Sequence, residues 1–153
     1  MRERLRALDV VNVGAAGTFV IRAPIARAEL KAHLLRCVPP KTEIVICRAG
    51  DVARAASEER FFAGPARAGV TRFVSVLSQR ARAKPVLPMQ FPSRGRWLLR
   101  ILGAEGRFVF GVYRRDMKVI GYLGALDRLF GVPVTTRNWN TMAAIARVLA
   151  ERR

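Results

Sequence analysis

The first sixty residues alternate between short β-branched, apolar runs and stretches whose apolar residues recur at helical spacing. Residues 9–13 and 18–22 are two such runs, separated by Gly14-Ala15-Ala16-Gly17. Because the two glycines can supply the positive φ angles of a tight turn, this region predicts a β-hairpin. One or two helical turns are expected before it, over residues 2–8.

Two helices and a strand are expected after the hairpin. An apolar helical period runs from Pro24, a favoured first helical residue, to Cys37. Residues 43–48 (Glu-Ile-Val-Ile-Cys-Arg) predict a buried strand. Asp51 is a suitable N-cap for a helix that ends near Phe61.

The second half predicts more strands. Residues 72–77 form one, and residues 97–102 and 107–113 form a second hairpin around a Gly-Ala-Glu-Gly turn. Residues 79–93 contain three prolines and no clear period, which indicates a loop.

The C-terminal part predicts two helices and a brief strand. Residues 119–130 have an apolar helical stripe, which Gly131 ends with a proline beyond it. Residues 134–136 form a short strand, and Asn138 caps a last apolar helix.

The order of these elements repeats. Strand, strand, helix, strand, helix occurs at residues 9–61 and again at 97–151, and the strand at 72–77 completes the second set in ferredoxin-like order. We therefore expect an α+β fold of two tandem ferredoxin-like units, residues 1–63 and 64–153, the first missing its opening strand. Since a missing strand exposes a sheet edge, a second copy of the chain, as a homodimer, or a rearranged segment should cover it.

The charge balance changes the picture of what the protein binds. The chain has 28 Lys and Arg against 11 Asp and Glu, a net charge of +17, and only four of the basic residues are lysines. Arginine binds phosphate bidentately and stacks on bases, so the surplus favours nucleic acid or another polyanion as a partner. An arginine-rich composition would explain the choice of Arg over Lys, but it does not explain the shortage of acids.

Basic and aromatic residues mix around the second predicted hairpin. In a strand, residues i and i+2 share a face, so Arg96 and Arg100 should point one way and Trp97 the other. Arginines beside an exposed aromatic ring would form a platform for single-stranded nucleic acid, whereas a core Trp97 would leave the arginines merely outside. The candidate nucleic-acid or anion-binding residues are Arg94, Arg96, Arg100, Arg107, Arg114, Arg115, Lys118 and Arg137.

The sequence offers no catalytic constellation. His33 is the only histidine, and it has only Cys37 one turn away, with no third group to orient the pair. The glycines at 14–17 precede a strand and not the helix of a dinucleotide-binding loop, and the Gly64–Gly69 spacing lacks the Lys-Ser/Thr of a phosphate loop. We therefore expect no catalytic residue, no cofactor and no metal.

The chain also gives no sign of a membrane protein. It has no signal peptide and no apolar stretch of the ~20 residues that a membrane span needs. A cytoplasmic protein without a membrane partner is expected.

One motif resembles a known family. Residues 131–141 (Gly-Val-Pro-Val-Thr-Thr-Arg-Asn-Trp-Asn-Thr), followed by an apolar helix, are similar to the closing motif of the bacterial family called domain of unknown function 1697. Residues 73–78 resemble its central strand, and residues 5–21 resemble its leading helix and hairpin, where members usually carry Ser-Gly-Asn instead of Ala-Gly-Thr. Members usually open with a further strand, and this sequence starts after it. The family has no established activity, so the resemblance implies a fold and no mechanism.

The same motif has a physical interpretation. Thr136 or Asn138 would cap the final helix, and Trp139 would anchor its first turn in the core. Arg137 would lie beside the positive helix end, which is unfavourable unless an anion binds there or a carboxylate pairs with it.

Three functions follow. A non-catalytic protein that binds nucleic acid or another polyanion leads. A structural or interaction protein that assembles through an exposed sheet edge is second, and an enzyme acting on a small anionic metabolite beside Arg137 is third.

Overall fold

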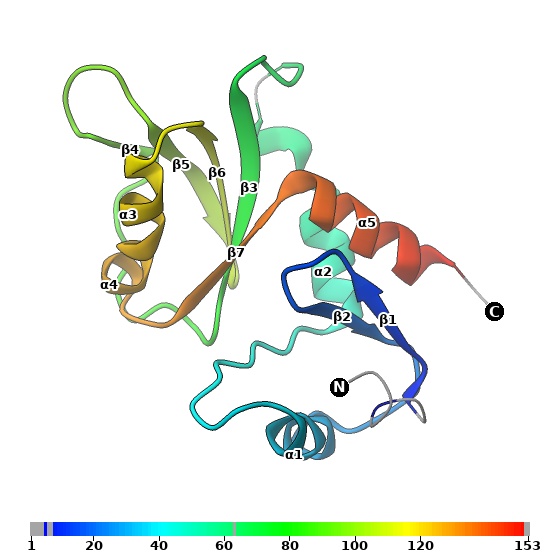
Figure 1. The fold of residues 1–153 in the computed structure, drawn as a ribbon. Helices are drawn as coiled ribbons and strands as arrows, with labels where there is room; N and C mark the ends of the chain where they lie inside the picture. Colours follow the sequence, from blue (N-terminus) through cyan, green and yellow to red (C-terminus); the bar gives the residue numbers. More distant parts are fainter. Residues whose placement is uncertain (1–4, 6–7, 63, 152–153) are drawn as a thin grey trace.

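The computed structural model describes residue 5 and residues 8–62 and 64–151, and it has an α+β fold (Figure 1). In chain order the elements are β1 (Val10–Val13), β2 (Thr18–Ile21), α1 (Arg27–Cys37), α2 (Ala49–Ala56), the short 3-10 helix η2 (Glu59–Phe61), β3 (Val70–Leu77), β4 (Met89–Phe91), β5 (Leu99–Glu105), β6 (Phe108–Arg114), α3 (Lys118–Gly124), α4 (Leu126–Phe130), β7 (Val134–Asn138) and α5 (Trp139–Ala150).

The strands form a five-stranded antiparallel sheet and a separate hairpin. The order in the main sheet is β4-β5-β6-β3-β7, and β1 pairs with β2 alone. Phe73 of β3 lies opposite Gly111 of β6 on one side and Asn138 of β7 on the other. A bulge between Ile101 and Gly103 shifts the register of β5.

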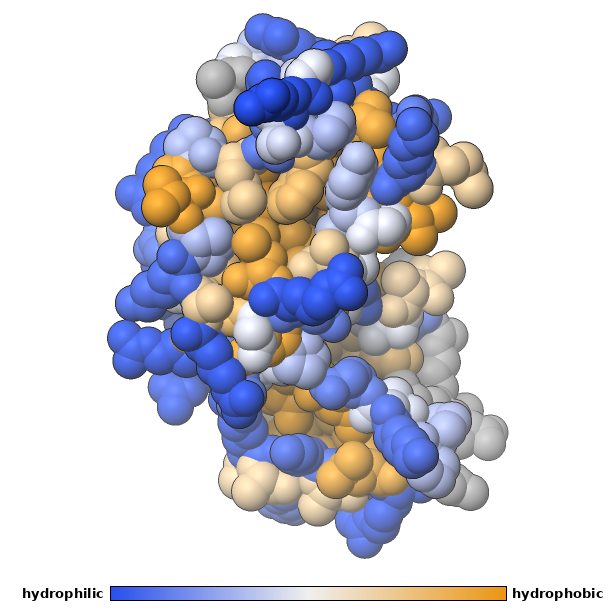
Figure 2. Space-filling model, turned by 90° about the vertical axis from the view of Figure 1, so that its left-hand side faces the viewer, coloured by the Kyte–Doolittle hydropathy of each residue, from blue (hydrophilic) through white to orange (hydrophobic). Residues whose placement is uncertain are grey.

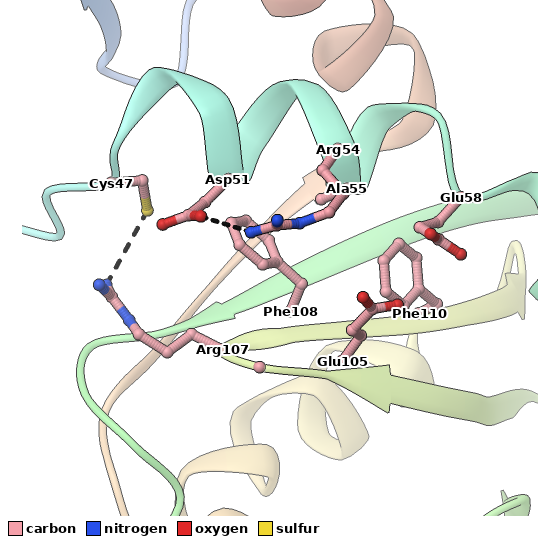
Figure 3. Close-up of a pocket in the computed structure, with 10 residues that line it drawn as sticks. Cys47, Asp51, Arg54, Ala55, Glu58, Glu105, Arg107, Phe108 and Phe110 are labelled. Atoms are coloured by element: carbon pink, nitrogen blue, oxygen red, sulfur yellow. Dashed lines mark hydrogen bonds and ion pairs between the residues drawn. The ribbon is translucent and has the colours of Figure 1, made fainter.

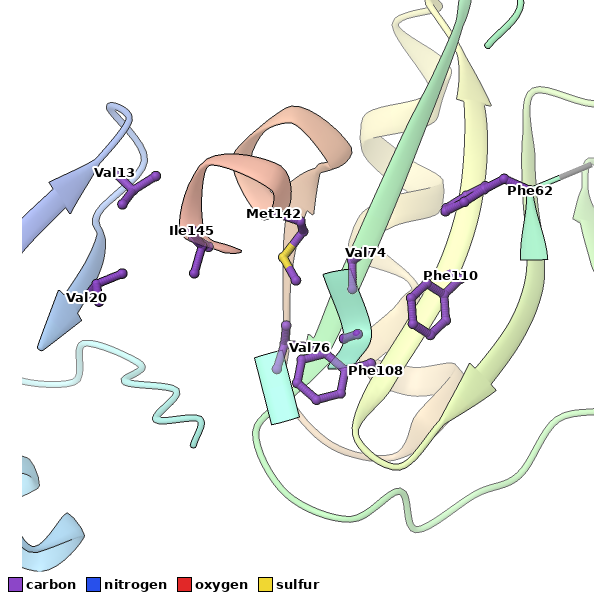
Figure 4. Close-up of a cluster of buried hydrophobic side chains, with 10 residues drawn as sticks. Val13, Val20, Phe62, Val74, Val76, Phe108, Phe110, Met142 and Ile145 are labelled. Carbon is purple, nitrogen blue, oxygen red and sulfur yellow. The ribbon is translucent and has the colours of Figure 1, made fainter. Parts of the chain in front are cut away.

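One face of the main sheet is covered by α2 and α5. Val74 and Val76 of β3 pack with Met142 of α5 in a cluster that also includes Val13 and Val20 of the hairpin. Figure 4 shows α5 between the hairpin and β3, so a single core joins the two sheets.

The opposite face is covered by α3 and α4. Phe73, Leu99 and Val109 point to this side, because side chains alternate along each strand, and they pack against Leu126 and Phe130 of α4. Figure 2 shows this side of the molecule, where hydrophobic side chains lie among hydrophilic ones. No helix in the described ranges has the length and apolar character needed to cross a bilayer.

The structure confirms both hairpins, the strand predicted at 72–77 and the final helix, but the prediction for residues 43–48 is wrong. These residues run extended without a strand partner, and their side chains are at best half-buried. No backbone N–H of residues 43–47 donates a hydrogen bond to a described residue. A strand sequence forms a strand only beside a free edge, and no described strand pairs with this segment. The described part of residues 1–63 therefore contains a hairpin and no larger sheet.

Smaller differences concern helix ends. Asp51 lies in the first turn of α2, which Arg48 precedes as N-cap, and the helix ends at Ala56. The helix expected at 119–130 is divided at Ala125 into α3 and α4, after a stretch with two glycines of low helix propensity. The expected loop at 79–93 includes the short edge strand β4. The helix expected at 2–8 falls largely outside the described residues.

Gly111 provides a test of the sheet packing. A Cβ at this position would lie 2.4 Å from the ring of the buried Phe73 and 2.5 Å from the carbonyl oxygen of Arg100. We expect Gly111→Ala to lower the free energy of unfolding by about 2 to 3 kcal/mol, because neither neighbour can move freely. Urea denaturation measures this change. Gly121→Ala in α3, where a Cβ meets nothing within 4 Å, should instead be neutral or stabilising, and equal losses in the two variants would contradict this packing.

Candidate nucleic-acid interface

Three arginines stand on one face of the main sheet, at the end where β3 begins and β6 ends. Arg72 of β3 and Arg100 of β5 both lie opposite Val112 of β6, and Arg114 lies two residues further along β6. They share the face of Val74, the face that α2 and α5 cover at the other end of the sheet. This end of the strands is at the top of Figure 1.

The arginines begin where an aromatic cover ends. The Phe61 ring stacks on Phe110 of β6 with centroids 4.8 Å apart, and Gly103 makes room because a Cβ there would lie 2.3 Å from that ring. Phe62 follows, and the Arg72 guanidinium lies over its ring, 5.0 Å from the centroid. Beyond Phe62 the sheet face carries arginine side chains in place of a helix.

Trp97, just before β5, holds two of the three cations. The guanidinium carbons of Arg100 and Arg114 lie 4.5 Å and 4.2 Å from the Trp97 ring centroid. The negative face of an indole attracts cations, so the ring fixes both side chains in place. The Nε of Arg114 is buried and has no hydrogen-bond partner among the described residues. We call Arg72, Arg100, Arg114 and Trp97 the arginine platform.

The platform lacks counter-charges. None of its arginines forms an ion pair with a carboxylate in the described part of the chain, where the paired arginines are Arg22, Arg54 and Arg60. Arg72 donates to the Gly64 carbonyl oxygen at 2.5 Å, and Arg100 donates to the side-chain oxygen of Gln90 at 3.5 Å. Since both acceptors are neutral, the full positive charge remains available to a ligand.

The structure gathers only part of the set predicted from sequence. Arg100 and Arg114 belong to the platform, and Arg94 and Arg96 are exposed in the segment that joins β4 to β5. Arg115 and Lys118 are exposed where β6 leads into α3. Arg72 was not among the residues predicted from the sequence, because its place beside Arg100 depends on the pairing of β3 with β6. Side chains alternate along a strand, so the sequence could have indicated only that Arg72 shares a face with Val74 and Val76.

Arg107 lies at the opposite end of the hairpin, in the turn between β5 and β6. Its Nε donates to the Leu77 carbonyl oxygen at 2.8 Å, and its terminal nitrogens donate to the Ile46 carbonyl oxygen. The side chain thus ties the extended segment 43–48 to the main sheet.

Arg137 also makes internal contacts. It donates to Thr18 and Ala16 of the hairpin and to Thr135 and Thr136 of its own strand, all at 2.7 to 3.0 Å. Burial lowers the pKa of this guanidinium from its ordinary value. No carboxylate in the described part of the chain pairs with Arg137, which directly precedes the N-cap of α5 and joins the hairpin to β7.

Thr136, Asn138 and Trp139 of the closing motif have different structural roles. Asn138 caps α5 by accepting from the Thr141 backbone N–H at 2.8 Å, as predicted. Thr136 instead bonds the hydroxyl of the buried Ser75. Trp139 packs edge-on against Phe62 with centroids 5.0 Å apart, which confirms it as an anchor.

A cavity of about 380 Å³ lies between α2 and the β5–β6 hairpin (Figure 3). Its three carboxylates each pair with an arginine: Asp51 with Arg54, and Glu58 and Glu105 with Arg60, which is not among the lining residues. At one end the Cys47 thiol faces Arg107 at 3.9 Å. No cluster of metal-ligating side chains occurs in the described residues.

Burial raises the pKa of the Cys47 thiol above its ordinary value, against the opposing effect of Arg107 and Arg27 and with a smaller contribution from Asp51. An unfolded thiol ionises near pH ~8.5, so the stability that the protonated thiol contributes is complete below that pH and is lost as the pH rises through the folded pKa. Urea unfolding at rising alkaline pH should therefore show a steeper loss of stability in the wild type than in Cys47→Ala. Parallel losses in the two proteins would contradict this burial.

Comparisons of the chain with protein-family models, with curated proteins and with solved structures found no match.

Proposed function

We propose that this protein is a non-catalytic binder of polyanions, with nucleic acid as the leading ligand, and that the arginine platform is its binding surface. The observation that carries the proposal is the set of three guanidinium groups on one sheet face without a carboxylate partner among the described residues. A phosphate-rich ligand would supply the missing counter-charge through bidentate hydrogen bonds.

The charge of the whole chain supports the same conclusion. A net charge of +17 attracts a polyanion from a distance, and the platform gives it a place to bind. Binding by counterion release predicts that log K falls linearly with log salt. Three phosphate contacts give a slope of about −2 on a single strand and about −3 on a duplex.

The test compares two triple variants of equal charge. Arg72→Gln, Arg100→Gln and Arg114→Gln together should weaken binding of a fluorescent oligonucleotide at least about tenfold and should flatten the salt dependence by about two units in slope. Fluorescence anisotropy at several salt concentrations measures both quantities.

The matched control carries Arg36→Gln, Arg80→Gln and Arg128→Gln, three exposed arginines outside the platform. It loses the same formal charge, so it should show only the smaller, general electrostatic effect. Equal weakening in the two triple variants would mean that net charge alone drives binding, and the platform would be rejected as the site.

A second candidate function is self-assembly through residues 43–47. This segment is extended and apolar at Ile44, Val45 and Ile46, and its backbone N–H groups have no partner within the described ranges. Since the Ile46 carbonyl faces Arg107, the backbone groups of Val45 point to the opposite, open edge. Antiparallel pairing with the same segment of a second copy would give the free backbone N–H and C=O groups of both chains hydrogen-bond partners and leave no free edge between them.

Proline substitution tests this assembly. Val45→Pro removes an N–H donor from the open edge, and it should shift a dilution series measured by analytical ultracentrifugation from dimer to monomer. The same substitution at Val86, which is 89% exposed in a loop, is the control and should leave the dimer intact. A wild type that is monomeric at all concentrations, even in salt that screens the positive charge, would exclude this function.

We also propose that residues 64–153 form a ferredoxin-like unit related to domain of unknown function 1697. The strand order β5-β6-β3-β7 and the passage from β6 to β7 through α3 and α4 support this, with residues 78–98 in place of a first helix. The kinship rests on the residues of the closing motif. We do not extend the proposal to an enzyme, because Arg137 uses four of its five donors within the fold.

A further inference from the structure

Building on the proposed function, we infer that the ligand of the arginine platform is single-stranded nucleic acid, and that Trp97 with its two arginines is the place where an unpaired base stacks. If the platform binds no polyanion, this inference fails with it. The inference adds to the proposed function that the nucleic acid is single-stranded and that Trp97 is the side chain that favours a single strand over a duplex.

The surroundings of the two tryptophans give the first argument. Trp139 is partly buried, packs against Phe62 and the buried cluster around it, and has a structural role. Trp97 has no ring partner among the described aromatic residues, and the guanidiniums of Arg100 and Arg114 lie over its ring. The half-buried indole therefore presents its ring to two cations and to no other described aromatic ring.

Stacked guanidinium and indole groups are suited to a base. A guanidinium is planar and weakly hydrated, so one of its faces can lie on an indole while the other receives a base, and its edge can still donate to phosphate. Arg100 is exposed, whereas Arg114 is half-buried with its Nε enclosed. The base would therefore approach from the side of Arg100. It would stack either on the Arg100 guanidinium or, after displacing that guanidinium, directly on the Trp97 ring.

The shape of the platform gives the second argument. Its arginines lie on three adjacent strands, β3, β6 and β5, so the row is about 10 Å wide, enough for one phosphate backbone. Reading a duplex requires a helix or a β-ribbon that enters a groove. These arginines stand on the face of a sheet, and the turn of the β5–β6 hairpin is at the other end of the strands. A duplex could meet the platform only through its phosphates, with its bases hidden.

The experiment compares three probes on the whole chain: an oligothymidylate of about 12 nucleotides, the duplex that it forms with its complement, and inorganic polyphosphate. We expect the single strand to bind more tightly than the other two at equal phosphate concentration. Trp97→Ala should weaken the single strand about tenfold or more, because stacking on one aromatic side chain contributes that much. The same variant should change polyphosphate binding by no more than about threefold.

Trp97→Phe separates stacking from folding. It keeps an aromatic face of smaller area, so its single-strand affinity should lie between those of the wild type and Trp97→Ala, with an unchanged urea midpoint. Equal affinity for all three probes, a preference for the duplex, or equal effects of Trp97→Ala on single strand and polyphosphate would overturn the inference and leave the polyanion proposal standing. Failure of all three probes to bind would overturn both.

Discussion

The positions of the two hydrophobic clusters and of the basic surface depend on the alternation of side chains along β3 and β6. β3 is paired on both edges and buried on both faces from Phe73 onward, so its odd-numbered and even-numbered residues enter two different cores. Phe73 can lie across β6 only because Gly111 has no side chain. The register set by this contact places Arg72 and Arg100 on either side of Val112, and so it builds the basic surface from residues 28 positions apart in the chain.

The same face of the sheet serves packing at one end and charge at the other. Val74, Val76 and Phe108 meet α2, α5 and the hairpin, and Phe61 and Phe62 complete the cover over Phe110. Past Phe62 the strands continue without a helix above them, and Arg72, Arg100 and Arg114 stand on this face around Val112. Aromatic rings mark the boundary on both sides: Phe62 under Arg72, and Trp97 under Arg100 and Arg114. Each ring offsets part of the cost of holding a cation at a fixed position without a carboxylate.

The parts of the fold that local sequence could predict are those with local causes. Glycines in the hairpin turns, Gly131 in the left-handed region after α4 and Asn138 at the start of α5 each act on neighbouring residues. Residues 43–48 have the composition of a strand, but composition cannot supply the neighbouring edge that a strand requires. The strand predicted at residues 43–48 is therefore wrong because its formation depends on tertiary structure, which the local sequence does not show.

The candidate site depended still more on tertiary structure. Arg100, Arg114 and Trp97 were selected from the mixture of basic and aromatic residues, and the structure places them together. Arg72 required the register of β3 on β6. Arg107 and Arg137 looked equally basic in sequence, yet they donate to carbonyl and hydroxyl groups that hold segment 43–48 and the hairpin to the main sheet. Trp97 is neither a core residue nor a bare exposed ring, because it lies against two guanidiniums.

Mapping the bound ligand by nuclear magnetic resonance tests the central claim most directly. On titration with oligothymidylate, the indole N–H of Trp97 and the Nε–H groups of Arg72 and Arg100 should show the largest chemical-shift changes, while the indole N–H of the partly buried Trp139, which packs against Phe62, shifts less. Shifts spread evenly over exposed arginines such as Arg36, Arg80 and Arg128, with Trp97 unchanged, would contradict the account.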